Sequence, residues 1–73
     1  MAKTIHTEDY RQVIERLKQA RLQAGLSQQE VANRLGKPQS YISKIESGER
    51  RLDIIEVKLL ANTYKKKLED IAE

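Results

Sequence analysis

The sequence predicts an all-α protein, a compact bundle of five helices, on the basis of three observations. Apolar residues recur at the three- and four-residue spacing of an amphipathic helix along most of the 73 residues. Glycines at positions 25, 36 and 48 divide the chain into helix-sized pieces, and glycine tolerates the left-handed conformation that ends many helices. Helix-starting polar patterns occur at Ser27 and Asp53. We find no strand pattern, internal repeat or low-complexity segment.

Composition limits the possible classes of protein. A chain of 73 residues with 38% apolar residues forms one small domain with a modest core. It contains no cysteine, so neither a disulfide framework nor a cysteine zinc site is expected. No apolar run is long enough to span a membrane, and we expect a soluble, cytoplasmic protein. A net charge of +3 and a pI near 9.3 suit a polyanionic partner.

The first helix is predicted to follow a flexible arm, residues 1–6, so that one domain covers residues 7–73. Thr7 is placed to cap this helix, with acidic residues in its first turn. The apolar side of the helix also takes in Arg21, four residues after Leu17. A charge on that side should have a buried or half-buried partner.

The second and third helices are predicted at residues 28–35 and 39–47. Ser27 and Glu30 form a capping box, in which each side chain binds the other's free backbone N–H, and Leu26 and Val31 occupy the positions of a hydrophobic staple. Pro38 prevents the second helix from continuing and suits the start of the third.

The fourth helix is predicted at residues 54–64, because Asp53 and Glu56 repeat the capping box and Leu52 and Val57 repeat the staple. Leu68 and Ile71 predict a short last helix packed on the core. The residues of the fourth helix expected to be buried are Ile54, Val57, Leu60, Ala61 and Tyr64.

The third helix has two unlike faces. Ile42 and Ile45 point to one side, and short polar groups with one lysine point to the other. Short hydroxyl side chains let a helix approach the floor of a groove, while Gln pairs with adenine and Lys donates to guanine. An ordinary polar surface helix is about equally consistent with this pattern. The basic residues that flank or occupy this region are Arg34, Lys37, Lys44, Arg50 and Arg51.

The preceding helix favours DNA binding; the alternative is a generic helical hairpin, which would not need basic groups at both flanks. A capped helix, a short turn with glycine and a second helix of this polarity make up a helix-turn-helix unit, here at about residues 27–48. In such units the second helix enters the major groove of DNA. The stretches GLSQQEVANRLGKPQSYISKIESGERR and LDIIEVKLLANTYKKKLEDI resemble the Cro/C1-type (XRE) helix-turn-helix domain, with its lambda-repressor-like fold. The resemblance implies a homodimer that binds double-stranded operator DNA.

The resemblance also implies roles for individual residues. The residues expected to read base edges are Gln39, Ser40, Ser43 and Lys44. Those expected to bind phosphates are Gln28, Lys37, Tyr41, Ser47, Arg50 and Arg51. Gln28 would also brace Gln39, and Arg21 would form a structural ion pair with Glu46. For Tyr41 the alternative is that it covers the edge of the core.

Two departures from the family pattern affect the second half of the domain. Leu52 replaces a frequent proline, and with Ile55 it is expected to form the dimer interface. The lysines at 65–67 replace the usual Gly-Val-Ser/Thr, so the fourth helix lacks the glycine that usually ends it and the last helix lacks the usual Ser/Thr cap. We expect these lysines to be a solvated helix end.

Two functions remain open. The first is a sequence-specific transcriptional regulator, with a repressor as the typical case. The second is a protein-interaction module such as an antitoxin-like subunit, suggested by the small size and the apolar residues near Ile55. We expect no enzyme, cofactor, metal or small-molecule ligand, because His6 is the single histidine and no catalytic or phosphate-binding motif occurs.

Overall fold

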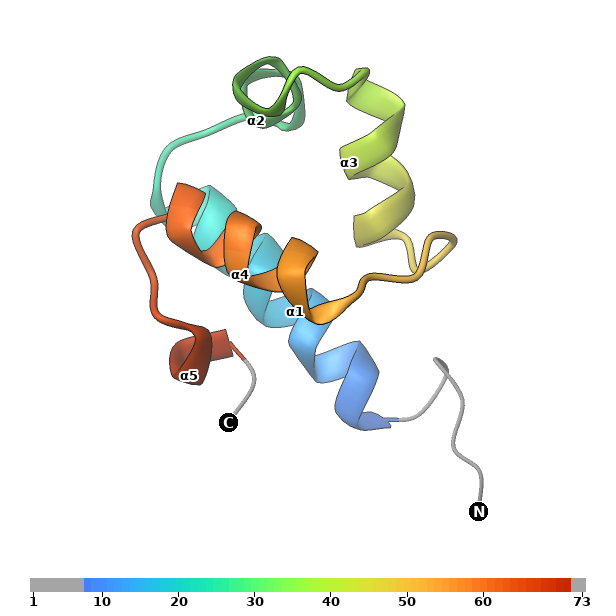
Figure 1. Ribbon diagram of the computed structural model, residues 1–73, viewed down its shortest axis with the longest axis vertical. Coiled ribbons are helices and arrows are strands. Elements are labelled where there is room, and N and C mark those ends of the chain that lie inside the picture. Colours follow the sequence, from blue (N-terminus) through green and yellow to red (C-terminus); the bar gives the residue numbers. More distant parts are fainter. Residues whose placement is uncertain (1–7, 72–73) are drawn as a thin grey trace.

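The structure, a computed structural model, describes residues 8–71, and these residues form five helices and no strand. The helices are α1 (Glu8–Gln23), α2 (Gln28–Leu35), α3 (Gln39–Glu46), α4 (Ile54–Thr63) and α5 (Leu68–Ile71) (Figure 1). The five-helix, all-α prediction is confirmed. The predicted arm and the cap at Thr7 lie outside the described residues.

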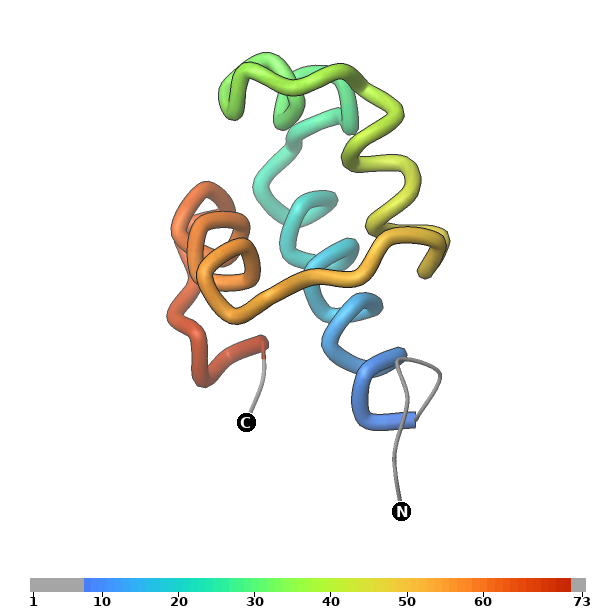
Figure 2. The backbone as a smooth tube through the Cα atoms, turned by 45° about the vertical axis from the view of Figure 1, so that its right-hand side comes forward, coloured from blue at the N-terminus to red at the C-terminus, as the bar shows by residue number. Residues whose placement is uncertain are grey.

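Helix α1 is the longest helix, and the others are arranged around it. It packs against α3, α4 and α5, while α2 packs on α3. Figure 2 shows α1 running through the middle of the bundle, with α4 on one side and α3 on the other. Within residues 8–71, this arrangement places α2 and α3 at one end of the bundle, where no other helix covers their outer side (Figure 1).

One core joins all five helices. Its centre is formed by side chains that are almost completely buried, among them Leu17 of α1, Val31 of α2, Ile42 and Ile45 of α3, and Ile71 of α5. The remaining core residues are Ile14, Ala20, Ala32, Leu52, Val57, Leu60, Ala61 and Tyr64. The apolar positions of α3 are therefore anchored in the domain, and its orientation is set by the whole bundle.

The predicted helix starts are formed by local hydrogen bonds. The Glu30 N–H donates to Ser27 Oγ at 3.0 Å, and the Ser27 N–H donates to Glu30 Oε1 at 2.8 Å. Asp53 and Glu56 repeat both contacts at the start of α4. Both capping boxes are confirmed, and they fix where α2 and α4 begin.

Two helices end one residue earlier than predicted. Ser47 is the C-cap of α3, and Tyr64 is the C-cap of α4. Tyr64 is still only 3% exposed. The backbone N–H of each cap residue still donates to the carbonyl four residues earlier, Ser47 to Ser43 O and Tyr64 to Leu60 O, both at 3.0 Å. Each predicted end thus lies within one residue of the observed one.

Two predictions about the start of α4 are wrong. Leu52 was expected at a partner surface, but it is 9% exposed and belongs to the core. Ile54 was expected in the core, but it is 56% exposed. Leu52 holds the staple position opposite the buried Val57 and fills the core at this end of the helix. The first residue of α4, Ile54, is therefore left outside.

The lysine run after α4 adopts an unusual helix ending. Lys65 has a φ of 61°, in the left-handed region where glycine is normally found. The Lys66 N–H donates to Ala61 O at 2.8 Å, so the ending has the hydrogen bond of a glycine-type stop. Lys67 precedes α5 and cannot cap it with its side chain, while its own N–H donates to Asp70 Oδ2 at 3.0 Å.

Candidate nucleic-acid interface

Helices α2 and α3 form a helix-turn-helix unit with a three-residue turn. Gly36 ends α2 in the left-handed conformation, with a φ of 70°. The Lys37 N–H then donates to Ala32 O at 2.9 Å, and Pro38 stands as the N-cap of α3 in extended conformation. The glycine allows a sharp reversal of the chain, and the ring of Pro38 restricts its own φ just before α3. The turn therefore sets the angle between the two helices.

The two faces of α3 differ in burial as the sequence predicts. Ile42 and Ile45 are each 1% exposed. On the opposite side Gln39, Ser40 and Lys44 are exposed, whereas Ser43 is half-buried. Three of the four residues expected to read bases thus lie on the free side of one helix, and Ser43 lies at its margin.

Arg21 and Glu46 form an ion pair inside the domain. Arg21 Nε donates to Glu46 Oε2 at 2.7 Å, and the two side chains are 9% and 7% exposed. A second guanidinium nitrogen donates to Glu46 Oε1 at 3.1 Å, and the third donates to Leu26 O at 2.8 Å. The buried charge on α1 is therefore paired with the last residue of α3.

Gln28 connects this ion pair to the start of α3. Its Nε2 donates to Glu46 Oε1 at 2.9 Å. Its Oε1 accepts a hydrogen bond from Gln39 Nε2. Gln28 is half-buried and lies in the first turn of α2. Through these two hydrogen bonds, its side chain connects the last residue of α3 to the first.

Tyr41 lies in a cluster with Lys37, Arg50 and Glu56. Its hydroxyl donates to Glu56 Oε2 at 3.0 Å, and Arg50 Nη2 lies 3.0 Å from the same carboxylate oxygen. The Arg50 guanidinium is 4.8 Å and Lys37 Nζ is 5.3 Å from the centre of the Tyr41 ring. Partial burial, followed by the bond to Glu56, raises the pKa of Tyr41 above its usual value. The ring also packs against the core.

Glu56 is a residue whose second role the sequence analysis missed. It was recognised as a capping residue only, yet it binds both Tyr41 and Arg50. The backbone N–H bond within the capping box, followed by these two side chains, lowers the pKa of its carboxyl group. Glu56 thus joins α4 to α3 and to the loop between them. The spacing of a capping box carries no signal for such partners.

The remaining expected phosphate ligands lie after α3. Ser47 and Arg51 are exposed, and Arg50 is half-buried. Ser47 Oγ has two acceptors within reach of its one hydroxyl hydrogen, Lys44 O at 3.2 Å and Glu49 Oε2 at 3.3 Å. These residues are close to the carboxyl end of α3 in the chain, whereas Gln28 and Lys37 adjoin its amino end.

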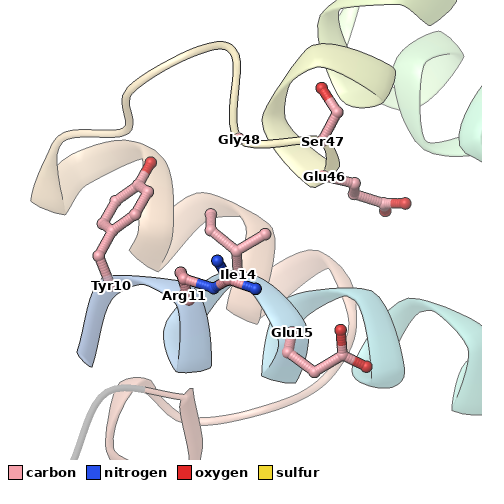
Figure 3. Close-up of a pocket in the computed structure, with 7 residues that line it drawn as sticks. All are labelled: Tyr10, Arg11, Ile14, Glu15, Glu46, Ser47 and Gly48. Atoms are coloured by element: carbon pink, nitrogen blue, oxygen red, sulfur yellow. The ribbon is translucent and has the colours of Figure 1, made fainter. Parts of the chain in front are cut away.

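A hollow of about 280 Å³ lies between α1 and the end of α3, lined by Tyr10, Ile14 and Glu46 among others (Figure 3). Tyr10 rises from α1 towards the loop after α3. The Leu52 N–H donates to Tyr10 Oη at 3.2 Å, and this hydroxyl donates to Arg50 O at 3.4 Å. Tyr10 thereby holds the loop in place. Its role was not predicted from the sequence, although Tyr10 lies four residues before Ile14 on the same side of the helix.

Residues 8–71 contain neither a metal-ligand cluster nor a membrane-spanning helix. No group of three or more acidic or histidine side chains is arranged to hold a metal ion there. In the same residues, every helix is too short or too polar to cross a membrane.

Comparison with known proteins identifies the family. The family described as "Helix-turn-helix" matches residues 17–71, which include all of α2 to α5. A search of curated proteins found no match. Because the match covers most of the chain, contains the α2–turn–α3 unit and agrees with the lambda-repressor-like arrangement of five helices, the chain belongs to the Cro/C1-type helix-turn-helix family of DNA-binding domains.

Proposed function

We propose that the protein is a sequence-specific transcriptional regulator that places α3 in the major groove of double-stranded DNA, as a homodimer on a two-fold symmetric operator. The observation that carries the proposal is the division of α3 into two faces. Ile42 and Ile45 anchor it in the core, while Gln39 and Lys44 extend from its free side. In a helix-turn-helix unit the second helix enters the groove while the first packs beside it. Here α3 is that second helix, and α2 packs against it.

Base reading is assigned to the free side of α3. Gln39 carries a donor and an acceptor side by side, and Lys44 carries donors only. These match the major-groove edges of adenine and of guanine respectively. Ser40 and Ser43 are short, so they would let the helix backbone approach the bases and contribute single hydrogen bonds.

Phosphate binding is assigned to groups at both ends of α3, namely Gln28, Lys37, Tyr41, Ser47, Arg50 and Arg51. Arg51 is the simplest candidate, because it is an exposed cation. Arg50 is paired with Glu56, which offsets part of its charge. Tyr41 has its hydroxyl on Glu56, so a phosphate bond would need that hydroxyl to change partner.

The dimer contact is assigned to the exposed side of α4. Ile54, Ile55 and Leu59 are 56%, 66% and 47% exposed there. Ile55 and Leu59 are four residues apart and share one face of the helix. Lys66 and Lys67 follow the other end of α4, so a contact centred on Ile54 and Ile55 would keep the lysines of two copies apart.

The same apolar side supports a second candidate, a protein-interaction module. Its partner would then be another protein, and DNA binding would be secondary. The specific observation is again the exposed pair Ile55 and Leu59, which lines a shallow hollow with Leu68 and three lysines.

A salt titration of DNA binding separates the two functions. The free protein is titrated with random duplex DNA and with a duplex selected for binding, at several salt concentrations. A sequence-specific regulator loses affinity steeply with salt and binds the selected duplex at least about a thousandfold more tightly. Weak binding with equal affinity for both duplexes would contradict the proposal and favour the interaction module.

A further inference from the structure

We propose that Glu46 is a positioning residue for base recognition: its carboxylate fixes the direction of the hydrogen bonds from Gln39 through Gln28, and so fixes which edge of its amide Gln39 presents to DNA. The inference rests on the proposed function, since it concerns how Gln39 would read a base. It gives a buried side chain without a DNA-facing atom a share in sequence preference.

The chain of hydrogen bonds runs from the interior to the free end of α3. Arg21 donates to both oxygens of Glu46, at 2.7 and 3.1 Å. Gln28 Nε2 donates to Glu46 Oε1 at 2.9 Å, and Gln39 Nε2 donates to Gln28 Oε1. The side chain of Glu46 is 7% exposed, and that of Arg21 9%. Water therefore has little access to the buried end of this series of hydrogen bonds.

The chemistry of Glu46 allows one direction for this chain. An ionised carboxylate accepts hydrogen bonds and donates none, and a paired guanidinium only donates. Gln28 must therefore turn its NH2 group towards Glu46, because its carbonyl oxygen would meet the carboxylate with two acceptors face to face. The Gln28 oxygen then faces Gln39, and Gln39 must supply an N–H. Each step follows from the acceptor at the buried end.

This direction determines what Gln39 has left for DNA. One of its two amide hydrogens is used on Gln28, so one N–H and the carbonyl oxygen remain. A donor beside an acceptor, in this fixed order, matches N7 and the N6 amino group of adenine. If the two amides were reversed, the Gln39 oxygen would face Gln28, and donor and acceptor would exchange places at the base edge. The N6 amino group of adenine would then face the donor of Gln39, and N7 of adenine would face its acceptor.

The test measures base preference with the full chain. Wild-type protein and the variants Glu46→Gln and Gln28→Met bind a selected duplex and versions carrying each other base at the pair contacted by Gln39, identified with Gln39→Ala. Glu46→Gln replaces the pure acceptor with an amide that works in either direction. Gln28→Met interrupts the chain at a half-buried position and leaves the ion pair in place.

We expect both variants to lower the preference for adenine over guanine at that pair by about fivefold or more, the size of one base contact. Changing both residues together should lower it no further. Two controls separate positioning from stability. Val57→Ala destabilises the core at a residue outside these hydrogen bonds and should keep the base preference. Glu46→Asp keeps a carboxylate, which only accepts hydrogen bonds, and should retain part of the preference. All proteins are compared at a temperature where circular dichroism shows them folded.

The outcomes distinguish this inference from the proposed function. A wild-type protein without base preference, or one whose preference is unchanged in Gln39→Ala, contradicts the proposed reading by α3. A wild-type preference that depends on Gln39 but survives in Gln28→Met contradicts the positioning role alone, even if Glu46→Gln fails to fold.

Discussion

At the scale of single residues, the domain depends on a few side chains that perform more than one task. Glu46 neutralises a buried arginine and also binds Gln28. Glu56 caps α4 and also binds Tyr41 and Arg50. A substitution of such a residue removes several interactions at once, because it leaves each of its partners without a hydrogen bond.

The ion pair should be important for stability. Arg21→Met leaves a buried carboxylate without its cation, and Glu46→Gln leaves a buried guanidinium without its anion. We expect each single change to lower the free energy of unfolding by about 3–5 kcal/mol, measured by urea unfolding. The double variant should lose less than the sum of the two, because no charge remains unpaired. Melting temperatures that stay unchanged in both single variants would reduce the pair to a surface feature.

Lys65 should be a site of avoidable strain. Its φ of 61° costs a residue with a side chain about 1–2 kcal/mol, whereas glycine adopts it freely. After the greater flexibility of glycine in the unfolded chain is subtracted, Lys65→Gly should raise the free energy of unfolding by about 0.5–1 kcal/mol. Lys66→Gly is the matched control, because Lys66 has no positive φ, and it should not stabilise. Equal effects of both changes on thermal unfolding would show that no strain is stored at Lys65.

At the scale of elements, α3 should divide its work with the groups beside it. Gln39→Ala and Lys44→Ala should relax base preference at particular pairs by about 1–3 kcal/mol while leaving binding to random DNA largely intact. Arg51→Ala should weaken binding to all sequences and reduce the slope against log salt by about one per protomer. Arg51 is a cleaner choice than Arg50, whose loss would also release Glu56 and Tyr41.

Competition binding with a panel of single-base variants measures this division. If Gln39→Ala and Lys44→Ala lowered affinity equally for every sequence, then α3 would not be the helix that reads the bases.

The elements themselves were largely predictable, because their signals are local. Ser27 with Glu30 and Asp53 with Glu56 define helix starts within four residues, and Gly36 defines a stop. Which side of α4 is buried was less predictable. Leu52 and Ile54 are both apolar and two residues apart, and the packing of other helices decides which one enters the core.

The candidate site was predictable in part. The pattern of α3 identified its free side, but the partners of Tyr41 and Glu56 come from separate helices. Such contacts depend on how α3 and α4 are placed in the bundle, and no short spacing in the sequence encodes them.

At the scale of the whole molecule, one copy of α3 is too short to specify a site in a genome, since it reaches only a few base pairs. A second copy would double the contacts, and its place is set by the dimer contact proposed on α4. Ile55→Asp should therefore weaken self-association, and it should weaken binding to a full operator more than binding to a half-site.

Leu22→Asp provides the matched control, since Leu22 is a 50% exposed apolar residue on α1 and lies outside the proposed contact. It should leave both properties unchanged. Analytical sedimentation measures them, and a wild-type protein that is monomeric both free and on DNA would contradict the dimer.

The most direct test of the central claim, that two copies of α3 read DNA sequence, is selection of bound duplexes from a random pool. We expect the wild-type protein to enrich two inverted half-sites whose centres lie about 10–10.5 base pairs, or about 34–36 Å, apart. The double variant Gln39→Ala, Lys44→Ala should lose that enrichment while still binding DNA weakly. A wild-type pool without an enriched sequence, or the same sequence enriched by the double variant, would contradict the claim.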